Sequence, residues 1–193
     1  MNDSCKDILN FVKENDVKFI RLAFCDHVGR QKNISLQPGE LERAFQSGIP
    51  FNAWELPGFH LSAGTKLLLR PDARTLSVLP WRPSSGRVIR MFCDLMNADG
   101  TPYGGDTRAV LQRTVLDAAQ LGYSIRIGSS CEFYLFNTDE NGCPMHVPQD
   151  RGTLFDLAPA DRGENVRRDI CLALSEMGII PESSHHAVGP GQN

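Results

Sequence analysis

The spacing of hydrophobic residues changes several times along this chain, and these changes restrict the folds that it can adopt. Residues Val17–Phe24 alternate apolar and polar side chains, as in a strand with one buried face. The turn-forming segment 26–30 follows, and Lys32–Leu36 is predicted to return as a second strand. Residues 164–177 instead place apolar side chains three or four positions apart, as amphipathic helices do. The two patterns together predict an α+β fold.

The first hundred residues contain enough elements for one small α+β unit. One helix is predicted to begin at Asp3 or Ser4, and a second helix is predicted within residues 38–48. Two further strands are predicted at Lys66–Arg70 and Val88–Met96. We therefore expect a few strands packed around helical segments in this part of the chain.

The Gly-rich segment 97–105 is the best candidate for a domain boundary. The elements predicted after it are a helix from Asp106 to Gly122, strands at Ser124–Ile127 and Cys131–Phe136, a helix from Glu164 to Met177, and a strand beginning at Ile179. Residues 138–160 are predicted to be mostly loop. A sheet with this small number of strands would have open edges. This part of the chain is therefore interpreted as a portion of a larger sheet.

Composition excludes several classes of protein. The formal net charge of −3 gives no basic surface, so nucleic acid is not expected as a partner. No apolar run approaches the roughly 20 residues of a membrane helix, so no membrane partner is expected. The amino-terminal residues lack the basic and apolar regions of a signal peptide, and a cytoplasmic location is predicted.

Glu132 is the first candidate for a functional residue. Period two places it on the same strand face as Tyr134 and Phe136. A carboxylate among aromatic side chains is unfavourable unless it is paired or bound to a cation. Spacing alone leaves two alternatives open, which are a ligand for a hard metal ion and a strand-end glutamate paired with an arginine.

The adjacent pair His185 and His186 is the second candidate. On an extended segment neighbouring side chains point to opposite faces, so only one of the two can enter a given site. Glu182 lies three residues earlier, about 10 Å away in an extended chain, and could serve another part of the same ligand. The alternative is a loop-end pair of ordinary polar residues.

Two further groups of residues have plain structural interpretations. The segment Asn52–Phe59 places Trp54 and Glu55 in a loop that could simply be packed. Arg162, Arg167 and Arg168 are most simply a solvent-facing group.

Several segments, in their order along the chain, resemble the glutamine synthetase family. The matching segments are Phe19–Asp26 with Gly29, Lys32 and Asn33, Phe51 with Gly58 and Phe59, Leu69–Thr75 with Leu79–Trp81, Cys93 and Asp94 with Asp99–Pro102, Glu132–Phe136, and Glu182–His186 with Gly191 and Gln192. Each motif is weak alone, whereas their joint order and spacing are specific. The likeness extends over nearly the whole chain from about residue 17.

The resemblance implies a β-grasp domain at residues 14–100 and the first, incomplete part of a catalytic α+β domain at residues 105–193. By resemblance, the protein is a ligase that uses ATP to join ammonia to the γ-carboxylate of glutamate through a γ-glutamyl phosphate. Mg²⁺ or Mn²⁺ would be required, and members of the family form homo-oligomeric double rings. Glutamate, ATP, and ammonia or another amine are therefore the expected partners.

The resemblance also assigns roles to individual residues. Glu132 matches the second glutamate of a Glu-x-Glu-Phe metal motif, and Glu182 matches a glutamate near the nucleotide. His185 and His186 match a His-His pair in the wall of the site. Asn52 and Glu55 fall in the substrate-site loop, where the family has other residues.

The departures from the family pattern concern the metal ligands. Ser130 replaces the first glutamate of the metal motif, and Ala187 replaces the glutamate that follows the His-His pair. The next metal glutamate would fall at position 194. We therefore expect this chain alone to bind catalytic metal poorly and to be inactive. A non-catalytic pseudoenzyme, or an assembly or regulatory module that keeps the fold, is the alternative, and the altered loop would suit an amine other than ammonia.

Overall fold

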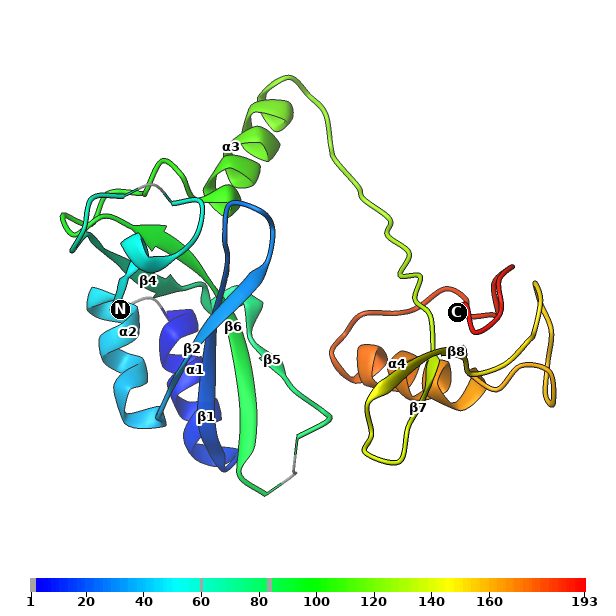
Figure 1. The fold of residues 1–193 in the computed structure, drawn as a ribbon. Coiled ribbons are helices and arrows are strands. Elements are labelled where there is room, and N and C mark those ends of the chain that lie inside the picture. Colours follow the sequence, from blue (N-terminus) through cyan, green and yellow to red (C-terminus); the bar gives the residue numbers. More distant parts are fainter. Residues whose placement is uncertain (1–2, 60, 83–84) are drawn as a thin grey trace. The chain divides into compact units, whose positions relative to one another are not determined.

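The computed structural model describes residues 3–59, 61–82 and 85–193. The chain separates into two compact units, Met1–Arg126 and Ile127–Asn193, and each unit is described by itself (Figure 1). Among the described residues, no helix is long and apolar enough to cross a membrane.

The first unit is built on a six-stranded mixed sheet. The strands follow the order β2-β1-β6-β4-β3, and β5 pairs with β6. The pair β1–β6 is parallel, and the other pairs are antiparallel. The strands are β1 (Val17–Cys25), β2 (Gln31–Leu36), β3 (Ile49–Asn52), β4 (Lys66–Pro71), β5 (Ser77–Val78) and β6 (Arg87–Met96).

The predicted hairpin of β1 and β2 is confirmed. Ile20 lies opposite Leu36, so the buried side chains of both strands face the same core. The turn is closed by Asp26, whose carboxylate accepts hydrogen bonds from the backbone N–H groups of Val28 and Arg30. Gly29 adopts a φ of 78° in this turn, which a residue without a Cβ does at no steric cost.

Helices α1 (Asp3–Glu14) and α2 (Leu41–Ser47) contact each other and lie against the sheet (Figure 1). Val12 of α1 and Leu41 of α2 belong to the same hydrophobic core as the strand residues. Short 3₁₀ turns, η1 (Pro38–Glu40), η2 (Ala53–Glu55) and η3 (Ala73–Thr75), connect the elements. The two helices and four of the six strands match the predictions, whereas the short strands β3 and β5 were not predicted.

Helix α3 (Thr107–Gln120) is attached to β6 through its first half, in which the Gln112 side chain donates to Asp94 at 3.3 Å. Asp106 caps it as predicted, accepting hydrogen bonds from the N–H of Arg108 and, at 2.9 Å, from the N–H of Leu95 in β6. Arg108 forms ion pairs with Asp94 and, at 2.7 Å, with Asp72. No residue of α3 is buried, so its apolar side is exposed.

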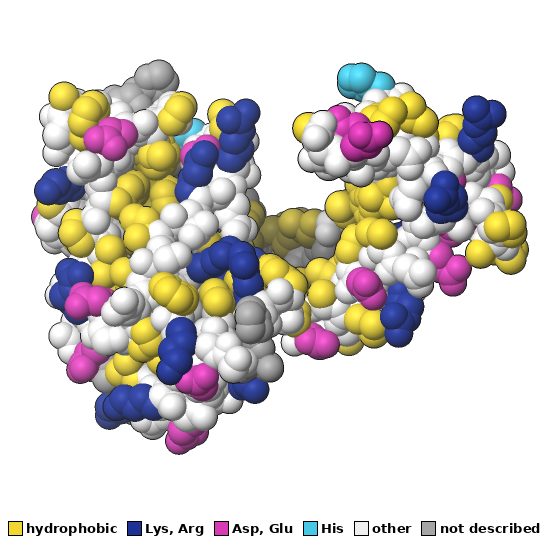
Figure 2. All heavy atoms as spheres, turned by 60° about the horizontal axis from the view of Figure 1, so that its bottom comes forward, with side chains coloured by type: hydrophobic (Ala, Val, Ile, Leu, Met, Phe, Trp, Pro, Cys, Tyr) yellow, Lys and Arg dark blue, Asp and Glu magenta, His cyan; other side chains and the backbone are white. Residues whose placement is uncertain are grey.

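The second unit contains the hairpin β7 (Phe136–Thr138) and β8 (Pro144–Pro148) and the helix α4 (Glu164–Glu176). Its buried residues are mainly polar or charged, and many of its apolar side chains are exposed. Figure 2 shows hydrophobic side chains spread over the visible surface of both units. The predicted helix is confirmed, but its apolar positions Val166 and Ile170 are uncovered.

The strand predictions for this part of the chain are largely wrong. Ser124–Ile127 and the run from Ile179 have no strand structure, and Cys131–Phe136 contributes only a bridge at Tyr134 and the first residue of β7. β8 falls inside the predicted loop. A strand exists only where a neighbouring strand exchanges backbone hydrogen bonds with it, and the predicted strand Ser124–Ile127 finds no such neighbour among the described residues.

Candidate functional site

Glu132 lies next to a short antiparallel pairing that attaches its segment to the end of the chain. Phe133 and Asn193 exchange backbone hydrogen bonds of 2.9 and 2.8 Å, and Leu135 donates to the carbonyl of Gly191 at 2.8 Å. Tyr134 therefore lies directly opposite Gln192. Opposite residues share a sheet face, which brings the Gln192 side chain to the face of Glu132.

Gln192 connects Glu132 to the Pro-Gly turn. Its side-chain amide N–H donates to the Glu132 carboxylate, and its amide oxygen accepts from the N–H of Gly189 at 2.7 Å. Glu132 is exposed and has this neutral amide as a partner. The structure thus joins Glu132 to Gln192, rather than to the arginine considered as an alternative.

His185 and His186 point to different sides of their segment, as predicted. His185 is exposed, its Nδ1 donates to the His186 carbonyl at 3.0 Å, and its ring meets the ring of Phe155 edge-on at 4.8 Å. His186 is fully buried. Its Nε2 lies 3.0 Å from Oδ1 of Asp150, and its Nδ1 lies 2.7 Å from the carbonyl oxygen of Ala187.

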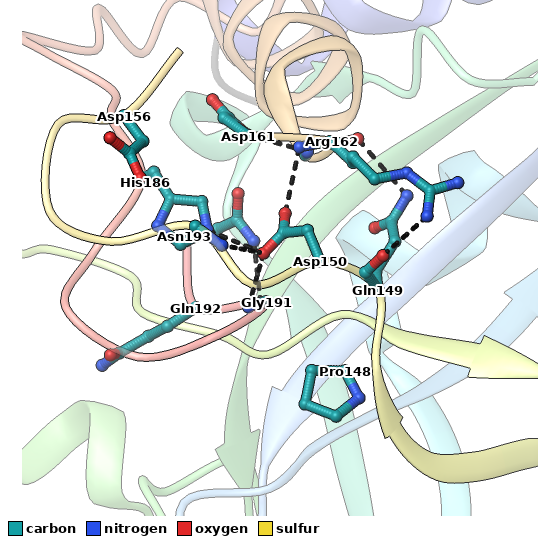
Figure 3. Close-up of polar contacts among 12 residues, drawn as sticks. Pro148, Gln149, Asp150, Asp156, Asp161, Arg162, His186, Gly191, Gln192 and Asn193 are labelled. Carbon is teal, nitrogen blue, oxygen red and sulfur yellow. Dashed lines mark hydrogen bonds and ion pairs between the residues drawn. The ribbon is translucent and has the colours of Figure 1, made fainter. Parts of the chain in front are cut away.

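Asp150 holds several segments of the second unit together (Figure 3). Its Oδ1 accepts from the N–H groups of Gly152 and Gly191 at 3.1 and 2.8 Å, as well as facing His186. Its Oδ2 accepts from the N–H of Arg162 at 3.0 Å. These hydrogen bonds outweigh the effect of burial and hold the pKa of Asp150 well below its ordinary value.

A second buried carboxylate, Asp161, forms a parallel cluster. Arg167 of α4 binds both of its oxygens, at 3.1 and 2.5 Å, and also donates to the side-chain oxygen of Asn193. The paired guanidinium is the main cause of the lowered pKa of Asp161. The interpretation of Arg167 as solvent-facing is therefore wrong, because its charge is neutralised inside the unit.

Two identical triplets in the sequence produce these clusters. Asp150-Arg151-Gly152 and Asp161-Arg162-Gly163 each turn so that the aspartate accepts the N–H of the glycine. A Cβ on Gly152 would lie 2.8 Å from Nε2 of His186, and a Cβ on Gly163 would collide with the Asn193 side chain. The repeated Asp-Arg-Gly pattern is the signal by which these residues could have been found from sequence.

The side chains of the other predicted residues lie outside these clusters, although the carbonyl group of Ala187 is hydrogen-bonded to His186. Ser130 is exposed on a segment without regular structure, and Glu182 is exposed on the run that leads to the histidines. Ala187 is half-buried, and its N–H donates to the Gln192 carbonyl at 2.9 Å. Asn52 and Glu55 are exposed in the first unit, where the Asn52 side chain donates to Glu55 at 3.4 Å.

The residues at the predicted metal positions do not fit a centre for several divalent ions. Such a centre needs about six oxygen-rich ligands per ion, with carboxylates that offset the charge. Of the three positions, only Glu132 supplies a carboxylate, because Ser130 and Ala187 are neutral. Asp150, Asp161 and His186 come within 4.8 Å of one another, but backbone N–H groups and Arg167 already occupy both carboxylates.

The fold defines a class of α+β protein, with a mixed six-stranded sheet and two helices followed by a smaller unit of one hairpin and one helix. Models of the glutamine synthetase β-grasp domain and catalytic domain match residues 16–98 and 104–193 respectively. The chain belongs to the glutamine synthetase family.

Curated proteins named glutamine synthetase align with almost the whole of this chain. The glutamine synthetase of Clostridium saccharobutylicum is 48% identical over 97% of this chain and 42% of its own length. That of Methanosarcina mazei is 42% identical over the same shares. The chain therefore spans about 42% of the length of these relatives.

Solved structures support the fold alone, because their sequences are distant. A structure described as a GmaS/ADP complex has a TM-score of 0.78 at 22% identity, covering 96% of this chain and 42% of its own. The Plasmodium falciparum glutamine synthetase, solved by cryo-electron microscopy, has a TM-score of 0.77 at 16% identity, with 97% and 43% covered.

Proposed function

We propose that this chain carries the β-grasp domain, residues 14–100, and the first part of the catalytic domain, residues 105–193, of an ATP-dependent ligase. The ligase would join ammonia or another amine to the γ-carboxylate of glutamate through γ-glutamyl phosphate. Family membership is the observation that supports this proposal most strongly. The family depends in general on ATP and on Mg²⁺ or Mn²⁺.

The 193 residues alone are proposed to be inactive and to bind catalytic metal poorly. Support comes from the donor set, since Glu132 is the one carboxylate at the three metal positions and its oxygen is engaged by Gln192. A phosphoryl-transfer site relies on divalent ions to neutralise the developing charge. Glu182 would lie near the nucleotide, and His185 and His186 would belong to the wall of the site.

The altered substrate loop suggests the nature of the amine. By resemblance to the family, Asn52, Trp54 and Glu55 stand where an aspartate and small residues are expected. Trp54 is 41% exposed and could contact a larger amine. We propose an amine other than ammonia as the substrate of the complete enzyme, which would act as a cytoplasmic homo-oligomer.

Metal titration tests the inactivity of the chain alone. Isothermal titration with Mn²⁺ is expected to show weak or undetectable binding by the 193-residue chain. Sub-micromolar Mn²⁺ binding that disappears in Glu132→Ala, but persists in the exposed control Glu140→Ala, would overturn the proposal that the chain has too few metal ligands.

A chimera tests the function of the complete enzyme. Residues 1–193 would replace the corresponding part of the Clostridium saccharobutylicum enzyme, and phosphate release would be measured with ATP, glutamate and a panel of amines. Turnover with an amine larger than ammonia supports the altered ligase. The second candidate function is that of a pseudoenzyme or assembly module, and the neutral residues at positions 130 and 187 favour it. It is supported if the chimera releases no phosphate with any amine and if Ser130→Glu together with Ala187→Glu restores the activity.

A further inference from the structure

The buried pairing of His186 with Asp150 is the feature of the second unit that the proposed function does not explain. Both side chains are almost completely inaccessible, at 2% and 0% exposure, and their contact of 3.0 Å joins residues 36 positions apart. Burying two ionisable groups is unfavourable unless they compensate each other. The pair therefore calls for a structural or functional account.

The hydrogen-bond partners of His186 determine its protonation. The carbonyl oxygen of Ala187 can only accept, so Nδ1 carries a hydrogen. Oδ1 of Asp150 already accepts from two backbone N–H groups, those of Gly152 and Gly191, as an ionised carboxylate does. Nε2 must therefore also donate, which makes His186 a buried imidazolium.

The surrounding charges agree with this state. Asp150 and Asp161 are the carboxylates that face His186, and Arg167 is the other cation of the cluster. Two negative and two positive groups thus cancel. Burial disfavours the charged ring, but the hydrogen bonds to Asp150 and Ala187 and the charge of Asp161 raise the pKa of His186 overall.

We propose that Asp150 is a positioning residue for the ligand wall formed by residues 182–193. By holding His186 as a cation and binding the N–H of Gly191, it fixes the Pro-Gly turn. Gln192, the next residue, is thereby placed against Glu132, and His185 is left on the exposed side. That this wall faces a ligand rests on the proposed function. The role of Asp150 in holding residues 182–193 rests only on the contacts within the second unit.

The second Asp-Arg-Gly turn, residues 161–163, also helps to hold residues 191–193 in place. Asp161 acts through Arg167 on the side chain of Asn193, as Asp150 acts directly on Gly191. The N–H of Arg162 donates to Asp150, so the two turns are joined. The two buried aspartates therefore hold alternate positions, Gly191 and Asn193, of the segment that pairs with Phe133–Leu135.

Nitrogen-15 NMR of the 193-residue chain tests the proposal without any ligand. With labelled histidine, His186 is expected to show hydrogens on both ring nitrogens at pH 7 and to titrate above its ordinary value of 6.5. The signals are assigned by their absence in His186→Gln, with the exposed His146→Gln as control. A neutral His186 ring at pH 6.5 in the wild-type chain would overturn the proposal.

The variant Asp150→Asn tests positioning. Because burial remains while the counter-charge is lost, the His186 titration should fall below 6.5. Amide hydrogen exchange at Gly191 and Gln192 should accelerate at least about tenfold, while the 139–143 turn, closed by Asp139, stays protected. Unchanged exchange at Gly191 and Gln192 would contradict the role.

The wild-type chain provides a second measurement if Asp150→Asn does not fold. The rate of amide hydrogen exchange at Gly191 and Gln192 should then increase with pH more steeply than the intrinsic exchange rate of an unprotected amide. The midpoint of this additional increase should coincide with the midpoint of His186 deprotonation. Absence of that step overturns the proposal. A chimera without ligase activity would leave these ligand-free results unaffected, so failure of the proposed function and failure of the positioning role are distinguishable.

Discussion

At the scale of single residues, charge compensation decides where polar side chains lie. Arg167 and Arg168 are neighbours with the same charge, yet one is buried against Asp161 and the other is exposed beside Asp169. A buried ion pair does not by itself confer net stability, but removing one partner leaves an uncompensated charge. An exposed pair contributes little, because water screens it.

We predict that Arg167→Met destabilises the second unit by about 3–5 kcal/mol. Arg168→Met, the matched control, should change its stability by less than about 1 kcal/mol. Hydrogen exchange measured by mass spectrometry over residues 127–193 would report both. Equal effects of the two substitutions would show that the Asp161 pair is dispensable.

Carboxylates with lowered pKa values make the first unit sensitive to acid. Hydrogen bonds from Arg74 and then Arg108 hold the pKa of Asp72 well below its ordinary value of 3.8. Because the folded-state pKa is depressed, its stabilisation is present above pH 3.8 and is lost as the pH falls through the folded-state value.

Asp72→Asn is therefore predicted to flatten the acid dependence of unfolding of the first unit. Tryptophan fluorescence is a selective probe, since Trp54 and Trp81 both belong to that unit. Urea unfolding at a series of pH values below 4 would show a smaller decrease in stability than in the wild type. An identical slope would contradict the assignment to Asp72.

At the scale of elements, local signals place helices and turns well, whereas strands depend on partners. Capping by Asp106 and termination at Gly122 and Gly178 are encoded within a few residues, and both glycines adopt positive φ angles. The segment 124–127 was predicted as a strand but forms none, because a strand needs hydrogen bonds from another segment.

A pair of glycine substitutions separates local strain from tertiary contact. Gly178 has a φ of 79° and open space around it, so Gly178→Ala should cost about 1–2 kcal/mol. At Gly191 a Cβ would also lie 2.6 Å from the carbonyl oxygen of Leu135. Gly191→Ala is therefore predicted to cost more and to open the pairing of residues 133–135 with 191–193. Thermal unfolding would compare the stabilities of the two variants, and hydrogen exchange would report whether the pairing of residues 133–135 with 191–193 has opened.

At the scale of the whole molecule, strands β1–β6 with α1 and α2 enclose a hydrophobic core, whereas α3 and α4 leave their apolar faces exposed. In α3, Leu111 and Leu116 are 56% and 63% exposed, and in α4 Ile170 is 41% exposed. A 14-residue helix with no buried residue gains little from packing. Exposed apolar faces of this kind promote association.

The 193-residue chain is accordingly predicted to bind a hydrophobic dye and to self-associate as its concentration rises. Leu111→Lys combined with Leu116→Lys should weaken both effects without unfolding the first unit, because neither side chain contributes to its core. Dye fluorescence and sedimentation velocity would measure the change. Association unaltered by the double substitution would exclude the α3 face as its cause.

The sequence by itself determined the features that depend on near neighbours and on the order of motifs. Helix caps, glycine turns and the β1–β2 hairpin follow from residues a few positions apart, and the ordered motifs identified the family. The roles of Glu132, Glu182 and the other site residues stay predictions.

Only the tertiary structure decided which polar residues are buried and which extended segments become strands. Asp150 and His186 are 36 positions apart, and Arg167 and Asn193 are 26 apart, so no local pattern could pair them. The physical reason is that burial of a charge, like formation of a strand, depends on partners that the folded chain brings from a distance.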